Sequence, residues 1–281
     1  MNRKGMTLIE LLVALTISGI LVAGVYRTFV SQQHTFTVQD QVVDMQQNVR
    51  LAINRMTREL RMAGFGRMDA TFFGAGKMHG IYQHVVNPGG GGNSVTVVGA
   101  YQAITTLSAN APSGSGAASS KVDPKFIQVN DASGFDTGSK QYISINGDES
   151  FQIQKITGNQ IELKAALSED HLAGEPVFLV IAITYSFGAF EGKSSLLRDD
   201  NLGLGPQPVA ENIDNLQFRY VMNTGETLDV VPNNRFDDIR MIQLTIVAIT
   251  DKPDPELAKV GDGFRRRTLT TNIQLRNLAF L

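Results

Sequence analysis

The pattern of apolar and polar positions changes abruptly within the first 64 residues. An apolar run covers residues 6–26, and Glu10 is its only charged side chain. Beyond this run, apolar residues recur in steps of three and four, which is the spacing of one helix face. The pattern predicts one helix over residues 6–64, apolar on all sides at first and amphipathic later. The recurring apolar positions are Val38, Val42, Met45, Val49, Ile53, Met56, Leu60 and Ala63.

The end of this helix is marked by residue types that suit a helix C-terminus. Gly64 and Gly66 stand where the periodic pattern stops, and glycine readily takes the left-handed conformation that ends helices. Arg58 and Arg61 precede them, where positive charge complements the negative end of the helix dipole. We therefore expect the helix to end near Gly64, with its apolar stripe packed on a β-sheet.

The remaining residues, 65–281, alternate between short apolar stretches and turn residues, which is typical of antiparallel β-structure. This predicts an α+β fold in which the long helix packs on a β-rich globular head. Residues 122–178 are expected to form a small inserted β subdomain, and residues 66–93 and 108–121 to form Gly- and Ser-rich loops. The expected subdomain strands are 126–129, 142–145, 151–156 and 161–163, and those of the main sheet are 176–187, 216–221, 239–249 and 268–275.

The apolar run is long enough to cross a membrane, which takes about 20 residues as a helix. Arg3 and Lys4 precede it and favour a cytoplasmic N-terminus, while no small-residue cleavage site follows it. A plain single-span anchor would explain all of this except Glu10. An acidic residue inside a membrane costs about 2.5–3.5 kcal/mol on insertion scales and is usually functional.

The sequence Gly5-Met6-Thr7-Leu8-Ile9-Glu10, placed after a short basic leader, resembles the type IV prepilin signal. The resemblance implies that residues 1–5 are a leader peptide, that prepilin peptidase cuts between Gly5 and Met6, and that the Met6 amine is methylated. Met6 stands where Phe is more usual. The resemblance also implies that Glu10 pairs with the Met6 ammonium of a neighbouring subunit during assembly. The two groups are four positions apart, so they can also meet within one helix.

Both ends of the chain, residues 56–65 and 269–278, resemble the PilW type of minor pilin of the type IV pilus. The resemblance implies a pilin-like fold and a tip complex that primes pilus assembly. The implied partners are prepilin peptidase, other minor pilins, the major pilin, the inner-membrane assembly platform and membrane lipid. The implied location is the inner membrane, single-pass with a periplasmic head, and after assembly a filament at the cell surface.

Two alternatives to a minor pilin remain open at this point. One is a pseudopilin J-like subunit of a type II secretion system, which uses the same kind of N-terminus and has a related helix end. The other is an adhesin or DNA-binding module at a pilus tip, with residues 65–180 as its binding surface. The net charge of −2 gives no argument for nucleic acid, and the run Arg265-Arg266-Arg267 is a weak signal.

The residues show no arrangement typical of catalysis, so we expect neither an enzyme nor a cofactor. The chain has no cysteine, which excludes thiolate metal sites and Cys-His catalysis. The histidines lack ligand spacing, and His79 and His84 are only a weak metal candidate. Two acidic pairs are weak calcium candidates, although turn chemistry explains them more simply: Asp199 with Asp200, and Asp237 with Asp238.

Overall fold

The computed structural model describes residues 7–68, 78–114 and 123–278. They contain one long helix, α1 (Leu8–Arg61), thirteen β-strands and four short 3-10 helices. The chain divides into two compact units, one of Met1–Gln47 with Thr250–Arg265 and one of Asn48–Ile249 with Arg266–Leu281. Helix α1 contributes its first part to the first unit and its last part to the second.

The first unit combines the N-terminal part of α1 with the loop Thr250–Arg265. Helix α1 is long and apolar enough to cross a membrane, and no side chain in its most apolar window is buried. The loop includes the 3-10 helix η3 (Leu257–Lys259) and is organised by Asp254, which is only 4% exposed. The Asp254 carboxylate accepts hydrogen bonds from Arg265 Nη2 at 2.6 Å and from the Glu256 N–H at 2.9 Å. His34 Nε2 on α1 lies 3.5 Å from the same carboxylate.

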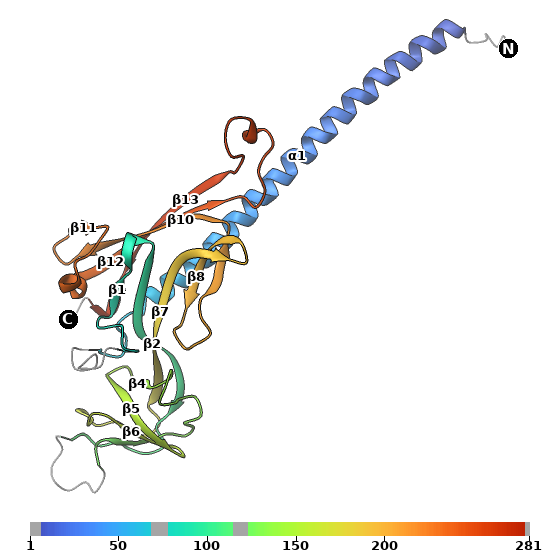
Figure 1. Cartoon of the computed structure of the whole chain (residues 1–281). Coiled ribbons are helices and arrows are strands. Elements are labelled where there is room, and N and C mark those ends of the chain that lie inside the picture. The colour runs from blue at the N-terminus through green and yellow to red at the C-terminus, as the bar shows by residue number, and fades with distance from the viewer. Residues whose placement is uncertain (1–6, 69–77, 115–122, 279–281) are drawn as a thin grey trace. The chain divides into compact units, whose positions relative to one another are not determined.

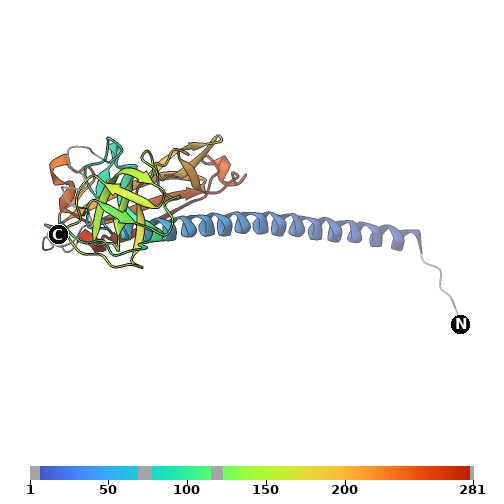
Figure 2. The ribbon, with the colours of Figure 1, turned by 90° about the horizontal axis from the view of Figure 1, so that it is seen from below.

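The second unit buries one face of the last part of α1. Its buried side chains include Val49, Met56 and Leu60 of the predicted stripe, together with Ala52, and the stripe's last residue, Ala63, is buried just beyond the helix end. Figure 2 shows α1 as one unbroken helical ribbon. The helix ends at Arg61, and Gly64 and Gly66 follow with φ angles of +78° and +112°, as their residue type predicts.

A nine-stranded antiparallel sheet forms most of the second unit (Figure 1). Its central strand, β7, pairs with β2 along one side, while β4 and β8 share the other side. The order of hydrogen-bonded neighbours in the sheet is β1-β2-β7-β4-β5-β6-β3. Strand β8 pairs with the second half of β7, and β9 pairs with β8. The strands are β1 (Val86–Pro88), β2 (Ser94–Thr106), β3 (Phe126–Gln128), β4 (Tyr142–Ile145), β5 (Glu149–Thr157), β6 (Gln160–Leu163), β7 (Pro176–Phe190), β8 (Lys193–Asp199) and β9 (Gln207–Glu211).

A second antiparallel sheet has four strands in the order β11-β10-β12-β13. They are β10 (Ile213–Met222), β11 (Thr227–Leu228), β12 (Ile239–Ile249) and β13 (Arg266–Gln274). The alternating pattern of β10 and β12 places one face of each strand in the core, including the fully buried Phe218 and Tyr220.

The structure confirms the α+β class, with a long helix and antiparallel sheets, but corrects the expected sheet. The four strands predicted for one main sheet are divided, because β7 belongs to the nine-stranded sheet and the other three to the four-stranded sheet. Alternation reveals which face of a strand is buried but not which distant strand it pairs with. The limits proposed for the inserted subdomain stay a prediction. Strands β3–β6 are joined to β7 through β4, whose pairs with β7 run from Ile143↔Leu179 to Ile145↔Val177.

The expected glycine-rich loops are only partly loops. Strand β1 and the 3-10 helix η1 (Gly90–Gly92) lie within residues 66–93, and the Gly89 N–H closes this turn on the Ser94 carbonyl at 3.0 Å. Residues 69–77 of the first loop and 115–121 of the second lie outside the described residues.

Candidate functional site

The predicted processing residues, Gly5 and Met6, lie outside the described residues, and the described chain begins beside them at Thr7. Thr7 precedes the first residue of α1 and contacts Glu10, one turn further on. The Glu10 Oε2 atom accepts hydrogen bonds from the Thr7 N–H and the Thr7 hydroxyl, both at 2.9 Å. In return, the Glu10 N–H approaches Thr7 Oγ1 at 3.4 Å. This reciprocal arrangement is a capping box, which satisfies backbone donors at a helix N-terminus.

The capping box adds a local role for Glu10 that the sequence reasoning missed. The signal was present, because Thr-x-x-Glu ahead of an apolar run is a known start of a helix. Both hydrogen bonds from Thr7 fall on one oxygen of the carboxylate. The second oxygen, Oε1, receives no hydrogen bond from any described residue and so can accept one from another donor.

The helix surface that follows Glu10 is apolar and exposed on every side. Leu8 is 79% exposed, Ile20 72% and Phe29 60%, and every described residue from Thr7 to Gln33 is classed as exposed. An apolar helix of this kind is stable only when lipid or other helices cover it. The sequence therefore provides a segment built for a membrane or for packing against neighbouring helices.

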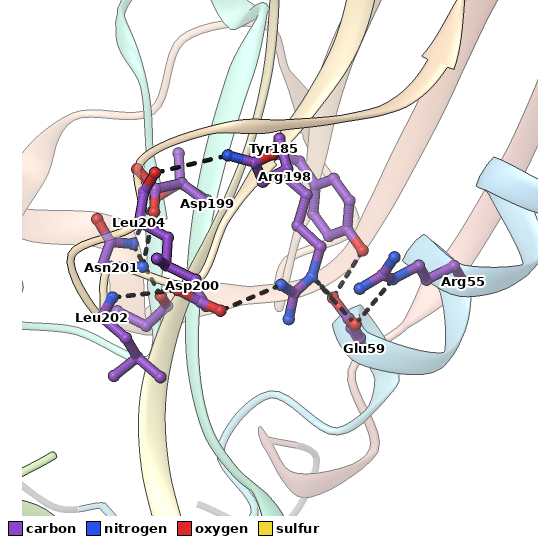
Figure 3. Close-up of polar contacts among 12 residues, drawn as sticks. Arg55, Glu59, Tyr185, Arg198, Asp199, Asp200, Asn201, Leu202 and Leu204 are labelled. Atoms are coloured by element: carbon purple, nitrogen blue, oxygen red, sulfur yellow. Dashed lines mark hydrogen bonds and ion pairs between the residues drawn. The ribbon is translucent and has the colours of Figure 1, made fainter.

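A second polar cluster connects the end of α1 to strands β7 and β8 (Figure 3). The Glu59 carboxylate accepts hydrogen bonds from the Tyr185 hydroxyl at 2.6 Å and from Arg198 Nε at 2.9 Å. Arg55 Nε lies 3.4 Å from it, one helical turn earlier. The side chains of Glu59 and Arg198 are only 16% and 15% exposed. Burial and the charge of Glu59 raise the pKa of Tyr185 well above its usual value.

This Glu59 cluster has the character of a structural joint. Every charge in it is matched by a nearby opposite charge, and Asp200 lies 3.7 Å from Arg198 Nη1 on the far side. The Tyr101 hydroxyl is also buried and has no hydrogen-bond partner within the described part of the chain. Burial, and to a lesser degree the Glu59 charge, raise the pKa of Tyr101 well above its usual value. Sequence reasoning missed this cluster because Tyr185 and Arg198 lie far from Glu59 along the chain.

The weak metal candidates are not assembled into a site. His79 stacks edge-on against Tyr142, with ring centroids 5.2 Å apart, whereas His84 Nδ1 lies 2.9 Å from Asp237. Within residues 7–68, 78–114 and 123–278, no three side chains of His, Cys, Asp or Glu come together. Two of the acidic candidates accept backbone N–H groups two residues ahead, as turn residues do: Asp199 from Asn201 and Asp200 from Leu202.

Comparisons with known proteins bear mainly on the N-terminus. A family described as the prokaryotic N-terminal methylation motif matches residues 1–26. None of the curated proteins compared with the sequence matches it. A type IV-like pilin from Thermus thermophilus aligns with a TM-score of 0.32 and 11% identity, covering 83% of this chain and 97% of that chain.

The methylation motif implies processing by prepilin peptidase, and together with the apolar helix it is consistent with anchoring in the inner membrane before assembly. Residues 1–26 therefore carry the prokaryotic N-terminal methylation motif.

Proposed function

We propose that this chain is a PilW-type minor pilin that is processed between Gly5 and Met6 and helps to prime assembly of a type IV pilus. The observation that carries the proposal is the methylation motif over residues 1–26, which continues into an exposed apolar helix. Cleavage ahead of this helix, and not after it, leaves the apolar segment attached to the mature chain. That segment anchors the chain in the inner membrane first and packs among other helices in the filament later.

Glu10 supplies the specific contact in this mechanism. Its Oε2 atom is held by Thr7 of the same chain, which fixes the carboxylate at the start of the helix. Its Oε1 atom is then available to the methylated Met6 ammonium of a neighbouring subunit. Each charge alone is costly in an apolar layer, and pairing them offsets much of that cost. The pairing would thus set the axial position of one subunit against the next.

The proposed partners are prepilin peptidase, other minor pilins, the major pilin and the assembly platform of the inner membrane. A pseudopilin J-like subunit of a type II secretion system would use the same N-terminal chemistry, and the motif fits both. Deletion of the gene separates them, since a minor pilin is required for surface pili and a pseudopilin for protein secretion.

The assembly role is tested by Glu10→Ala and the conservative Glu10→Gln, each expressed in place of the natural chain. We expect both variants to lose their leader normally and to remain in the membrane, with surface pili strongly reduced, because neither offers a carboxylate to an incoming ammonium. A Glu10→Asp variant is the matched control that keeps the charge. Normal pili from cells that carry Glu10→Ala would refute the assembly role of Glu10. They would leave the proposed cleavage between Gly5 and Met6 unaffected.

A further inference from the structure

Strand β13 forms an exposed edge of the four-stranded sheet (Figure 1). It pairs with β12 through nine consecutive residue pairs, and no register shift interrupts the ladder. The other terminal strands in the described chain are shorter: β11 has two residues, β1 and β3 have three, and β9 has five. The nine residues of β13 are therefore the longest edge that the described chain presents.

The hydrogen-bond pattern shows which residues of β13 direct their backbone N–H and C=O groups away from β12. The Leu275 N–H donates to the Arg240 carbonyl at one end of the ladder, and the Thr250 N–H donates to the Arg265 carbonyl at the other, both at 3.0 Å. Residue pairs in an antiparallel ladder alternate between bonded and non-bonded. The odd-numbered residues of β13 thus bond to β12, and the even-numbered residues direct their N–H and C=O groups toward the free edge.

Beyond Arg266, four even-numbered residues line this free edge: Thr268, Thr270, Asn272 and Gln274. All four are exposed, and no backbone hydrogen bond from the described chain reaches their N–H or C=O groups. Their side chains continue rows that begin on β12, as the 3.2 Å contacts Thr245–Thr270 and Gln243–Asn272 show. A further strand would find both a backbone template and an ordered row of side chains.

The edge lacks the features that usually prevent strand addition. Proteins protect exposed edges with proline, charged side chains (lysine above all), a bulge or a very short strand. Strand β13 contains neither proline nor lysine, and its only charged side chains, Arg266 and Arg267, stand at its first two positions. The rest of the strand is uncharged, has an unbroken register and is rich in threonine, which favours β-structure. An edge that is long, regular and open in this way fits a partner whose backbone completes it.

The charges near the start of β13 indicate what that partner carries. Arg265 is paired with Asp254, and Arg266 with Asp214 at 2.9 Å. Arg267 is exposed and has no ion pair with any residue of the described chain. It lies on the opposite face of the strand from Thr268. A carboxylate on an added strand, directly across from Arg267, would complete the charge pattern.

We propose that β13 binds an extended segment of a partner polypeptide as an antiparallel fifth strand, with an acidic residue of the partner opposite Arg267. The segment is about nine residues, or about 30 Å, long at 3.4 Å per residue. It carries threonine or other β-branched side chains, and its acidic residue lies near its C-terminal end because the strands run in opposite directions. Backbone hydrogen bonds supply affinity, and the side chains supply specificity. This binding role is independent of the pilus proposal.

The first test uses a synthetic peptide and two variants at one position. The peptide alternates threonine and valine over nine residues, with glutamate at the eighth, and its binding to the full chain in detergent micelles is followed by fluorescence anisotropy. Thr270→Pro removes an N–H that β12 does not use, so the ladder is preserved while the edge is blocked. Thr270→Val keeps the N–H and is the control. We expect a loss of affinity of about tenfold or more for Thr270→Pro and little change for Thr270→Val.

Two further measurements keep the test decisive if Thr270→Pro disturbs the fold. A peptide N-methylated at its third, fifth and seventh residues should not bind, because those amides face the edge. Bound peptide should slow amide exchange at Thr268, Thr270 and Asn272. Arg267→Gln should weaken the binding of the peptide that carries glutamate at its eighth position. It should leave the binding of the same peptide with glutamine at that position unchanged. The proposal is wrong if no saturable binding occurs up to about 1 mM peptide, or if the N-methylated peptide binds as well as the unmodified one.

Discussion

The Glu59 cluster gives the sharpest prediction about what joins the long helix to the head. In Glu59→Gln, the side chain keeps its size but loses its charge, while Arg198 stays largely buried. Removing one partner of a buried ion pair costs about 3–5 kcal/mol. Asp200, 3.7 Å from Arg198, retains part of the compensation. The Tyr185 hydroxyl loses its charged acceptor. We therefore expect the free energy of unfolding to fall by about 2–4 kcal/mol.

The assay is denaturant and thermal unfolding of the full chain in detergent micelles. For a unit of this size, about 1 kcal/mol lowers the Tm by about 2–4 °C, so the expected decrease is about 4–16 °C. The matched control is Glu169→Gln, because Glu169 forms a 3.0 Å pair with Arg67 but is 55% exposed. Such an exposed pair contributes about 0–1 kcal/mol.

The cycle of Glu59→Gln, Tyr185→Phe and the double variant isolates the interaction between these two residues. Because the hydroxyl and the carboxylate are 2.6 Å apart, their effects should be non-additive by about 0.5–3 kcal/mol. Two results would contradict this role of the cluster. One is a free energy of unfolding for Glu59→Gln that equals that of Glu169→Gln. The other is a double variant whose loss of stability is the sum of the losses in the two single variants.

Three other predictions concern pH and the start of the helix. Burial raises the pKa of three tyrosines, so their contribution to stability is fully present below about pH 10 and is lost as the pH rises further. The free energy of unfolding, measured from pH 8 to 11, should show this decrease. A free energy of unfolding that does not change with pH would contradict it. The raised tyrosines are Tyr101, Tyr185 and Tyr220. Hydrogen bonds, first from Arg265, lower the pKa of Asp254, so its contribution is present above about pH 4 and disappears as the pH falls through its lowered pKa. Acid should then lower the protection of amides in the loop Thr250–Arg265, measured relative to the intrinsic exchange rate at each pH, and Asp254→Asn should show low protection at every pH. Thr7→Ala should cost the helix start about 0.5–2 kcal/mol, seen as faster exchange in its first turn, whereas Thr7→Ser should not.

Much of the fold was readable from the sequence because its signals are local. The steps of three and four from Val38 to Ala63 predicted the long helix, and the glycines at 64 and 66 predicted its end. Alternation located several strands within a few residues, as at β4 and β12, but it did not predict β8 or β9. These features depend on neighbours along the chain, so a single sequence contains them.

The features that sequence reasoning missed depend on distant pairing. Nothing in the pattern of β7 indicates that it joins β2 and β8 and stays apart from β12. Nothing near Glu59 points to Tyr185 or Arg198, which are 126 and 139 positions away. The capping box of Thr7 and Glu10 is the exception, because its residues are three positions apart and its signature was visible.

The central claim, that the N-terminus is a processed pilin-type signal, is tested most directly by the intact mass of the chain. The protein is produced with and without prepilin peptidase, extracted in detergent and measured by mass spectrometry. We expect loss of residues 1–5 and addition of one methyl group on Met6 only when the peptidase is present. A chain that keeps its N-terminal residues in the presence of active peptidase would contradict the account and leave a membrane-anchored, β-rich protein.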